Sequence, residues 1–291
     1  MANRTGGYGY ENTSHYTNTT LQFCNIQNIH AVRDSLQKLW SLCHSATGND
    51  VQFGPAVEDS KWLAHIRTIL QASWETAYWI HIWRIPVLLH CSHGWDRTSQ
   101  VAALSQLLLD PYYRTLKGFA VLVEKDFMSF GHPFHRRCAH GEGRSSNSSS
   151  SNANNDLDEG QVSPIFIQFL DCVYQLVALL PNCFEFTKDY LWLLARHTYT
   201  CRFGTLLCDT EQERERQAAI RLRTFSVFDY LEGLPESTNA DFDKEDKGVL
   251  LMPLSTLLRN CHLWTEKHCE DAPKPMQPTG VTTGNAPTRR P

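Results

Sequence analysis

Residues 87–100 read Val-Leu-Leu-His-Cys-Ser-His-Gly-Trp-Asp-Arg-Thr-Ser-Gln, and this stretch carries most of the structural information in the chain. Cys91 is followed by five residues and then by Arg97. The five intervening backbone N–H groups can curl around one phosphate as an anion-binding nest. The Cys91 thiolate would then lie below the phosphorus, and the Arg97 guanidinium would bind two phosphate oxygens in a bidentate fork.

The residues on either side of this loop support a phosphate-binding geometry. The apolar run at 85–89 predicts a short buried strand, and residues 98–109 predict a helix with one apolar face. A strand, a tight loop containing Gly94 and a helix N-terminus together bind phosphate and lower the pKa of a thiol. The alternative is a buried structural thiol at Cys91, with Arg97 in a surface ion pair.

Two other cysteines have the same spacing to an arginine and are interpreted as chance matches. Cys138 precedes Arg144 within a Gly-, Ser- and Asn-rich stretch. Cys208 precedes Arg214, but the acidic residues between them would repel a phosphate.

The segment at 90–100 resembles the signature loop of the myotubularin family. Trp95 followed by Asp96 and Arg97 is unusual among cysteine phosphatases, which makes the resemblance specific. It covers about residues 3–265, with further family-like segments at 109–119, 121–132, 163–173, 184–186 and 201–208. The resemblance implies an α/β, protein tyrosine phosphatase-like fold that is helix-rich around a small central sheet.

The resemblance also implies an activity, the hydrolysis of the 3-phosphate of phosphatidylinositol 3-phosphate and of phosphatidylinositol 3,5-bisphosphate. Cys91 would attack the phosphorus and form a phosphocysteine intermediate. Arg97 would stabilise charge on the transferring phosphoryl group. Asp96 would protonate the leaving inositol oxygen and then activate water, or, as the alternative, only cap the following helix. No metal or other cofactor is expected.

Further substrate contacts carry over by position. They are Ser92, His93, Gly94 and Trp95 within the loop, and Asn3, Asn28, Ile29 and Arg137 outside it. Asn28 could instead cap the helix that begins at Ile29, and Arg137 could be an ordinary surface charge.

Three departures from the family pattern bear on function. His93 replaces an acidic residue, which removes a repulsion next to the phosphate and could redirect activity. Pro133 stands where relatives often have a second arginine, and this predicts weaker discrimination toward the bisphosphate. The family's lipid-binding PH-GRAM domain and the first part of its phosphatase domain would precede Asn3, so we expect a partial domain.

The chain is expected to contain one phosphatase domain at residues 1–268, a disordered insertion at 142–160 and a disordered tail at 269–291. Apolar residues at helical spacing predict helices beginning near residues 29, 62, 98, 119, 164 and 188, and a short one near 227. Strand-like runs are few, at 20–24 and 87–90, and both should be central and buried.

Composition excludes several classes of protein. The net charge of −4 argues against nucleic-acid binding, although a local basic pocket can still bind an anionic lipid. No apolar run approaches the ~18 residues of a membrane span. Ten cysteines without paired spacing and a polar N-terminus predict reduced thiols in the cytoplasm. The resemblance to the myotubularin family implies peripheral contact at endosomal-type membranes. The His/Cys clusters at 132–140 and 261–269 lack the ligand spacing of zinc sites.

Three hypotheses for function follow. The first is an active phosphoinositide 3-phosphatase, favoured because Cys91, Asp96 and Arg97 are all retained. The second is a catalytically impaired family member that binds or regulates partners, including homo- or hetero-oligomers with other members. The third is a protein tyrosine phosphatase. Against this hypothesis, no general acid on a separate mobile loop can be identified in this sequence.

Overall fold

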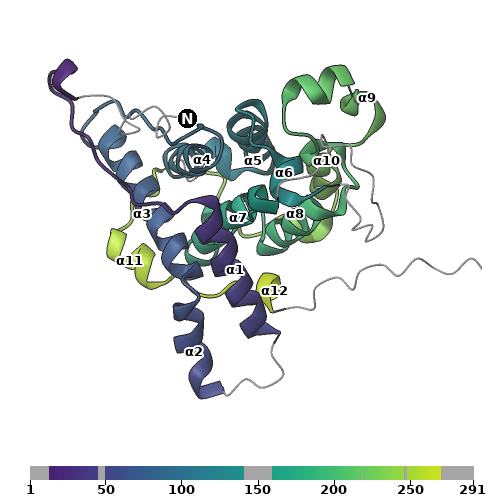
Figure 1. Cartoon of the computed structure of the whole chain (residues 1–291), viewed down its shortest axis with the longest axis horizontal. Coiled ribbons are helices and arrows are strands. Elements are labelled where there is room, and N and C mark those ends of the chain that lie inside the picture. The colour runs from purple at the N-terminus through teal and green to yellow at the C-terminus, as the bar shows by residue number, and fades with distance from the viewer. Residues whose placement is uncertain (1–12, 45–49, 141–158, 218, 246–247, 270–291) are drawn as a thin grey trace, which may run out of the picture.

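The computed structural model describes residues 13–44, 50–140, 159–217, 219–245 and 248–269 (Figure 1). The α-helices in these ranges are α1 (Ile29–Cys43), α2 (Asp50–Asp59), α3 (Trp62–His81), α4 (Arg97–Leu109), α5 (Leu116–Val123), α6 (Phe134–Cys138), α7 (Ile165–Leu179), α8 (Lys188–Thr200), α9 (Ile220–Arg223), α10 (Val227–Glu232), α11 (Leu254–Arg259) and α12 (Thr265–His268). A π-helical turn, Glu124–Ser129, extends α5.

Helix α7 lies at the centre of the molecule, and nearly all of its side chains are buried (Figure 1). It packs against α3 and α4 on one side and α8 on the other. A helix that is buried on every face is stable only when other helices cover it, which explains this central position. One hydrophobic cluster extends from Val32 in α1 to Trp264 before α12, so most of the described helices share a core.

Most of the predicted helices are present. The apolar face expected near residue 29 is the buried face of α1, where Val32 and Leu39 are inaccessible to solvent. Helix α7 begins after Ser163 and Pro164 as expected, but the Ser163 hydroxyl donates to the Ile29 carbonyl oxygen instead of capping α7. This bond ties the start of α7 to the start of α1.

The predicted central sheet is not confirmed, because the described residues contain no β-strand and only one isolated bridge, between Phe186 and Thr238. The expectation that both strand-like runs are buried is wrong: the Phe23 side chain is 63% exposed and Leu88 is 87% exposed. Apolar runs become strands only when a neighbouring strand completes their hydrogen bonds, and no described segment pairs with these two. Left-handed backbone at Asn25 and Arg84 also bends the chain beside them.

Two predicted irregular regions fall largely outside the described ranges. Of the insertion expected at 142–160, only Glu159 and Gly160 are described, in the 3-10 turn Glu159–Gln161. Of the tail expected at 269–291, only Cys269 is described, directly after α12.

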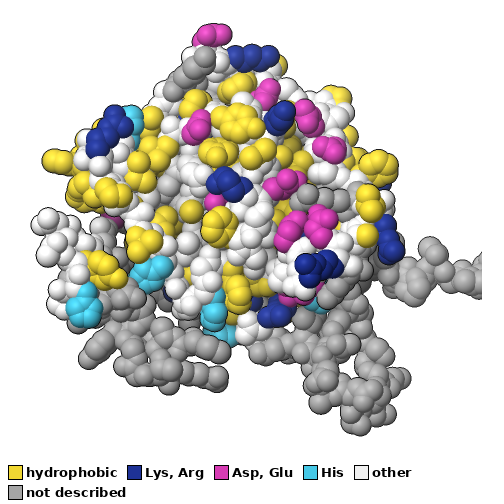
Figure 2. Space-filling model, turned by 90° about the horizontal axis from the view of Figure 1, so that it is seen from above, with side chains coloured by type: hydrophobic (Ala, Val, Ile, Leu, Met, Phe, Trp, Pro, Cys, Tyr) yellow, Lys and Arg dark blue, Asp and Glu magenta, His cyan; other side chains and the backbone are white. Residues whose placement is uncertain are grey.

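The surface mixes side chains of all kinds. Figure 2, a view of the molecule from above, shows hydrophobic side chains interspersed with acidic and basic ones, without a dominant charge.

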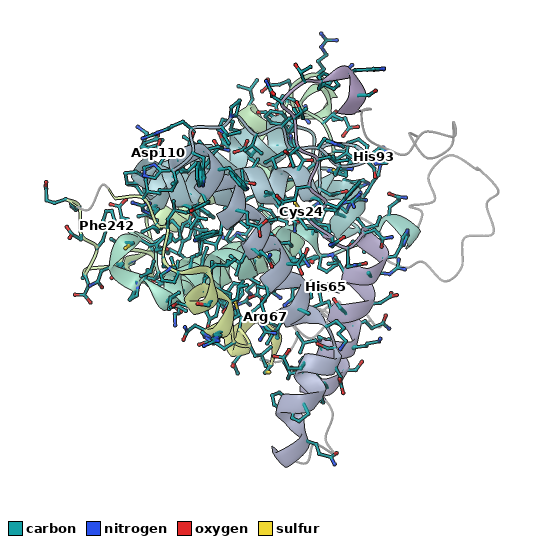
Figure 3. The ribbon with its side chains drawn as sticks, turned by 90° about the vertical axis from the view of Figure 1, so that its left-hand side faces the viewer. Cys24, His65, Arg67, His93, Asp110 and Phe242 are labelled. Atoms are coloured by element: carbon teal, nitrogen blue, oxygen red, sulfur yellow. The ribbon has the colours of Figure 1, made fainter. Side chains whose placement is uncertain are left out.

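Helices α2 and α3 are joined by an ion pair. Arg67 of α3 donates two hydrogen bonds to Glu58 of α2 and lies beside the α11 region (Figure 3). None of the described helices is long and apolar enough to cross a bilayer.

Candidate active site

The loop that contains Cys91 is held between two helices. Helix α3 ends near His81, and the Ile85 N–H bonds the Trp79 carbonyl across a turn in which Arg84 has a φ of 55°. The chain then runs without helical structure to Cys91 and enters α4 at Arg97. The predicted arrangement of loop and helix N-terminus is therefore present.

The surroundings of Cys91 favour the thiolate over the thiol. Burial raises the pKa of Cys91, but hydrogen bonds from the Thr98 hydroxyl and from the N–H groups of His93, Thr98 and Gly94 outweigh it, so the pKa is lower than usual. The Gly94 nitrogen lies 3.2 Å from Sγ, and the φ of +84° at Gly94 is a backbone conformation that glycine adopts without strain. The Thr98 hydroxyl has no other hydrogen-bond partner in the described residues, so its proton is available to the thiolate.

Arg97 bridges the loop and the segment before α1. Its Nη2 donates to the Ser92 hydroxyl at 3.1 Å, and its Nη1 donates to the Ile26 carbonyl at 3.4 Å. Both are neutral acceptors at ordinary or long distance. A phosphate dianion would displace them, because hydrogen bonds between charged groups are roughly twice as strong.

Asp96 forms the strongest polar contact of the site. The Asp96 side chain is only 11% exposed. Its carboxylate accepts from Arg137 in a bidentate fork, Nε to Oδ1 at 3.1 Å and Nη2 to Oδ2 at 2.8 Å. His132 Nδ1 lies 3.2 Å from Oδ1 of Asp96 and 2.8 Å from the Trp95 carbonyl oxygen. Asp96 stands at the N-cap position of α4, yet its side chain makes no capping bond. The capping alternative for Asp96 is therefore wrong.

These contacts control the charge of Asp96. Burial raises its pKa, but the hydrogen bonds from His132 and Arg137, together with their charges, hold the pKa well below its usual range. In this structure Asp96 is an ionised carboxylate.

Arg137 is buried rather than on the surface, and only 3% of it is exposed. Besides Asp96, it donates from Nη1 to the Gln161 backbone oxygen at 2.8 Å and to the Gln161 side-chain oxygen at 3.2 Å. The surface-charge alternative for Arg137 is wrong, and its contact with substrate stays a prediction.

Of the predicted contacts outside the loop, Asn28 and Ile29 stand at the start of α1. Asn28 caps α1, its Oδ1 accepting from the N–H groups of His30 and Ala31 at 3.1 Å. The prediction that Asn28 caps this helix is thus confirmed, and Ile29 is the first residue of the helix. Asn3 lies outside the described residues.

His93 and Trp95 form a stacked pair. Their ring centroids are 4.8 Å apart at an interplanar angle of 5°. Figure 3 shows His93 toward the periphery of the molecule. The Trp95 Nε1 atom is buried without a partner in the described part of the chain.

Sequence reasoning missed two residues of this site, His132 and Gln161. His132 stands at the end of a family-like segment, but nothing local indicates that its ring reaches Asp96, 36 positions earlier in the chain. Gln161 follows the long polar insertion, where a structural role has no sequence signal.

Of the other two cysteine–arginine pairs, Cys208 and Arg214 do not form a phosphate loop, and the segment from Cys138 to Arg144 lies largely outside the described residues. Cys138 is buried, which raises its pKa to about 12, and Arg144 lies outside the described residues. Arg214 binds the Leu207 carbonyl and the Glu211 carboxylate. Within the described ranges, no three His, Cys, Asp or Glu side chains are grouped to hold a metal ion.

Comparison with known proteins places this site in a family context. The profile of the myotubularin-like phosphatase domain matches residues 1–215. The chain is 43% identical over 231 residues to mouse phosphatidylinositol-3-phosphate phosphatase MTMR7, covering 79% of this chain and 33% of that protein. It is 39% identical over 265 residues to mouse phosphatidylinositol-3,5-bisphosphate 3-phosphatase MTMR6, covering 91% of this chain and 40% of that protein.

Human phosphatidylinositol-3,5-bisphosphate 3-phosphatase MTMR8 is 38% identical over 265 residues, again covering 91% of this chain and 35% of the relative. The chain thus spans between about a third and two fifths of the length of these relatives.

Proposed function

The chain belongs to the myotubularin-like phosphatase family, and from this we propose that it removes the 3-phosphate of phosphatidylinositol 3-phosphate through a phosphocysteine intermediate. The observation that carries the proposal is the Cys91–Arg97 loop, in which hydrogen bonds lower the pKa of the nucleophilic thiol. The names of the MTMR6, MTMR7 and MTMR8 relatives support an inositol lipid as the substrate.

The first chemical step uses three residues. The Cys91 thiolate attacks the phosphorus while Arg97 exchanges its Ser92 and Ile26 contacts for two phosphate oxygens. The bond from phosphorus to the inositol oxygen breaks, and that oxygen takes a proton from Asp96.

Asp96 must be protonated for this step, although in the structure Arg137 and His132 keep it ionised. We infer that a phosphate group of the substrate draws Arg137 away from the carboxylate. Losing this cation raises the pKa of Asp96, since burial alone favours the neutral acid. Substrate binding would thereby favour the protonated form of Asp96, which can then act as the general acid.

In the second step, Asp96 has become a carboxylate and removes a proton from water. The water oxygen attacks the phosphocysteine, the P–S bond breaks, and the Cys91 thiolate and inorganic phosphate are released. Ser92, His93, Gly94, Trp95, Asn28 and Ile29 would line the substrate in this scheme.

We also propose the α/β form of the phosphatase fold, in which the segments at 20–24 and 87–90 belong to a sheet. Their exposed apolar side chains, Phe23 and Leu88, support this proposal. Amide hydrogen exchange would test it, because paired strands would protect these amides and unpaired ones would exchange at once. As further proposals, the protein acts in the cytoplasm at endosomal-type membranes and associates with family members.

The testing experiment is phosphate release from short-chain phosphatidylinositol 3-phosphate by the full chain, beside Cys91→Ser. Release that the substitution abolishes supports the thiolate mechanism. A phosphotyrosine peptide assayed in parallel separates the lipid enzyme from a protein tyrosine phosphatase. If circular dichroism shows folded helices but no phosphate is released, the second candidate, a binding or regulatory family member, is favoured. The Asp96–Arg137 ion pair also favours this candidate, because it keeps the carboxylate of the acid engaged.

A further inference from the structure

Two thiols from distant parts of the chain are in contact. Cys43 is the last residue of α1, and Cys269 directly follows α12. Their Sγ atoms are hydrogen-bonded at 3.1 Å, across a sequence separation of 226 residues. Both are free thiols.

The surrounding packing holds these thiols together. Helix α12 lies against α1 (Figure 1). His268, next to Cys269, binds the buried Asp171 carboxylate through Nε2 at 3.0 Å. Trp264, just before α12, stacks on Tyr174 with ring centroids 4.7 Å apart. The segment that carries Cys269 is therefore anchored to the core. Its thiol is held against Cys43, so forming a bond between the two sulfur atoms needs no large rearrangement of the backbone.

The two sulfur atoms lie close to the distance of a disulfide bond. An S–S bond is about 2.05 Å long, so the two sulfur atoms need to approach by roughly 1 Å. Side-chain rotation about the Cα–Cβ bonds supplies such a movement. Both residues are partly exposed, so a small oxidant in solvent can reach them.

We propose that Cys43 and Cys269 are a modification site at which a low-molecular-weight disulfide, such as oxidised glutathione, closes a reversible disulfide bond. The thiolate of one cysteine attacks the glutathione disulfide, forms a mixed disulfide and expels one glutathione thiolate. The second cysteine then attacks the protein sulfur of that mixed disulfide and expels the other glutathione. Two protein thiols are oxidised, one disulfide is reduced, and the two protons pass to the released thiolates.

Burial, together with the hydrogen bond between the two sulfur atoms, raises the pKa of Cys43 to about 12. Because the thiolate is the nucleophile, the exchange with glutathione disulfide should become faster as the pH rises.

The bond would join α1 covalently to α12 and close a long loop. Long loops lose the most unfolded-state entropy when they are closed, so the melting temperature should rise by roughly 5–10 °C. Helix α1 is about 22 Å long at 1.5 Å per residue, which separates Cys43 from the catalytic loop near its other end. The inference is independent of the proposed catalytic activity.

The test uses the full chain with Cys91→Ser, so that the reactive catalytic thiol does not consume the oxidant. The protein is equilibrated with oxidised and reduced glutathione, alkylated, and analysed by intact mass and non-reducing peptide mapping. We expect two fewer alkyl groups than in the fully reduced control, a peptide pair linked through Cys43 and Cys269, and a higher melting temperature that dithiothreitol reverses. Cys43→Ser and Cys269→Ser should each abolish the linkage and the shift, whereas Cys201→Ser, at an exposed thiol, should preserve both.

Other outcomes would overturn the proposal. Separate glutathione adducts on Cys43 and Cys269, without a linked peptide, would show that the two sulfur atoms cannot meet. A mixture of linkages among several cysteines would show that the structure does not select this pair. A shift in melting temperature that survives in Cys43→Ser would have another origin.

Discussion

Replacing Arg137 by glutamine tests the ion pair on which the candidate acid depends. The substitution removes both Arg137 hydrogen bonds to Asp96, at 2.8 and 3.1 Å, and leaves a side chain that is 11% exposed without its bidentate partner. Breaking a buried ion pair from one side costs about 3–5 kcal/mol. Because His132 still contacts Asp96, we expect the lower end, a loss of about 3 kcal/mol in the free energy of unfolding at pH 7.

The pH dependence gives the sign of the effect. The folded-state pKa of Asp96 is lowered, so its stabilisation is complete above the unfolded pKa and is lost as the pH falls toward the folded value. With an unfolded pKa of about 3.9, the difference between wild type and Arg137→Gln should be full above about pH 5 and should narrow below about pH 4. Urea denaturation at a series of pH values measures this difference.

Arg136 offers a matched control in the same helix. Its guanidinium pairs with Asp209 at 2.9 Å, but its side chain is 53% exposed, so Arg136→Gln should cost no more than about 1 kcal/mol. The reasoning would be refuted if both variants lost the same stability, or if the Arg137→Gln loss were as large at pH 3.5 as at pH 7.

Three further outcomes are expected. Iodoacetamide should alkylate Cys91 with a midpoint pH below that of a free cysteine, and Thr98→Val should move the midpoint upward; an unchanged midpoint in the variant would remove Thr98 from the argument. The chain should turn over phosphatidylinositol 3-phosphate faster than the 3,5-bisphosphate, and Pro133→Arg should narrow the gap; faster bisphosphate turnover by the unmodified chain would contradict this. Trp62→Phe, which removes the 2.7 Å hydrogen bond to the buried Asp171 carboxylate, should lower the free energy of unfolding by about 1–3 kcal/mol in chemical denaturation, and a loss below 0.5 kcal/mol would show that Asp171 does not need this donor.

Local features of the site could be predicted from the sequence because they depend on neighbouring residues. The spacing of Cys91 and Arg97 places the thiol and the guanidinium on one loop, and the helical periodicity after Arg97 predicts α4. Gly94 supplies the left-handed conformation that such a turn uses. Asn28 as a helix cap is likewise a short-range interaction.

Contacts between distant segments could not be predicted in the same way. Arg137 reaches Asp96 across 41 positions, and His132 and Gln161 join it only because α6 and the start of α7 fold against the loop. The apolar runs near Phe23 and Leu88 have strand-like composition, but composition does not say whether a neighbouring strand is present, and none of the described segments pairs with them.

The sequence by itself therefore determined the family, the nucleophilic loop and most helices, since short spacings and periodicities encode each of them. The tertiary structure alone decided that Asp96 is held ionised by a buried arginine and histidine. It also brought Cys43 and Cys269 together across 226 positions of the chain. The physical reason is that burial and charge pairing depend on which segments lie next to each other in space. The separation of two residues along the chain does not determine this.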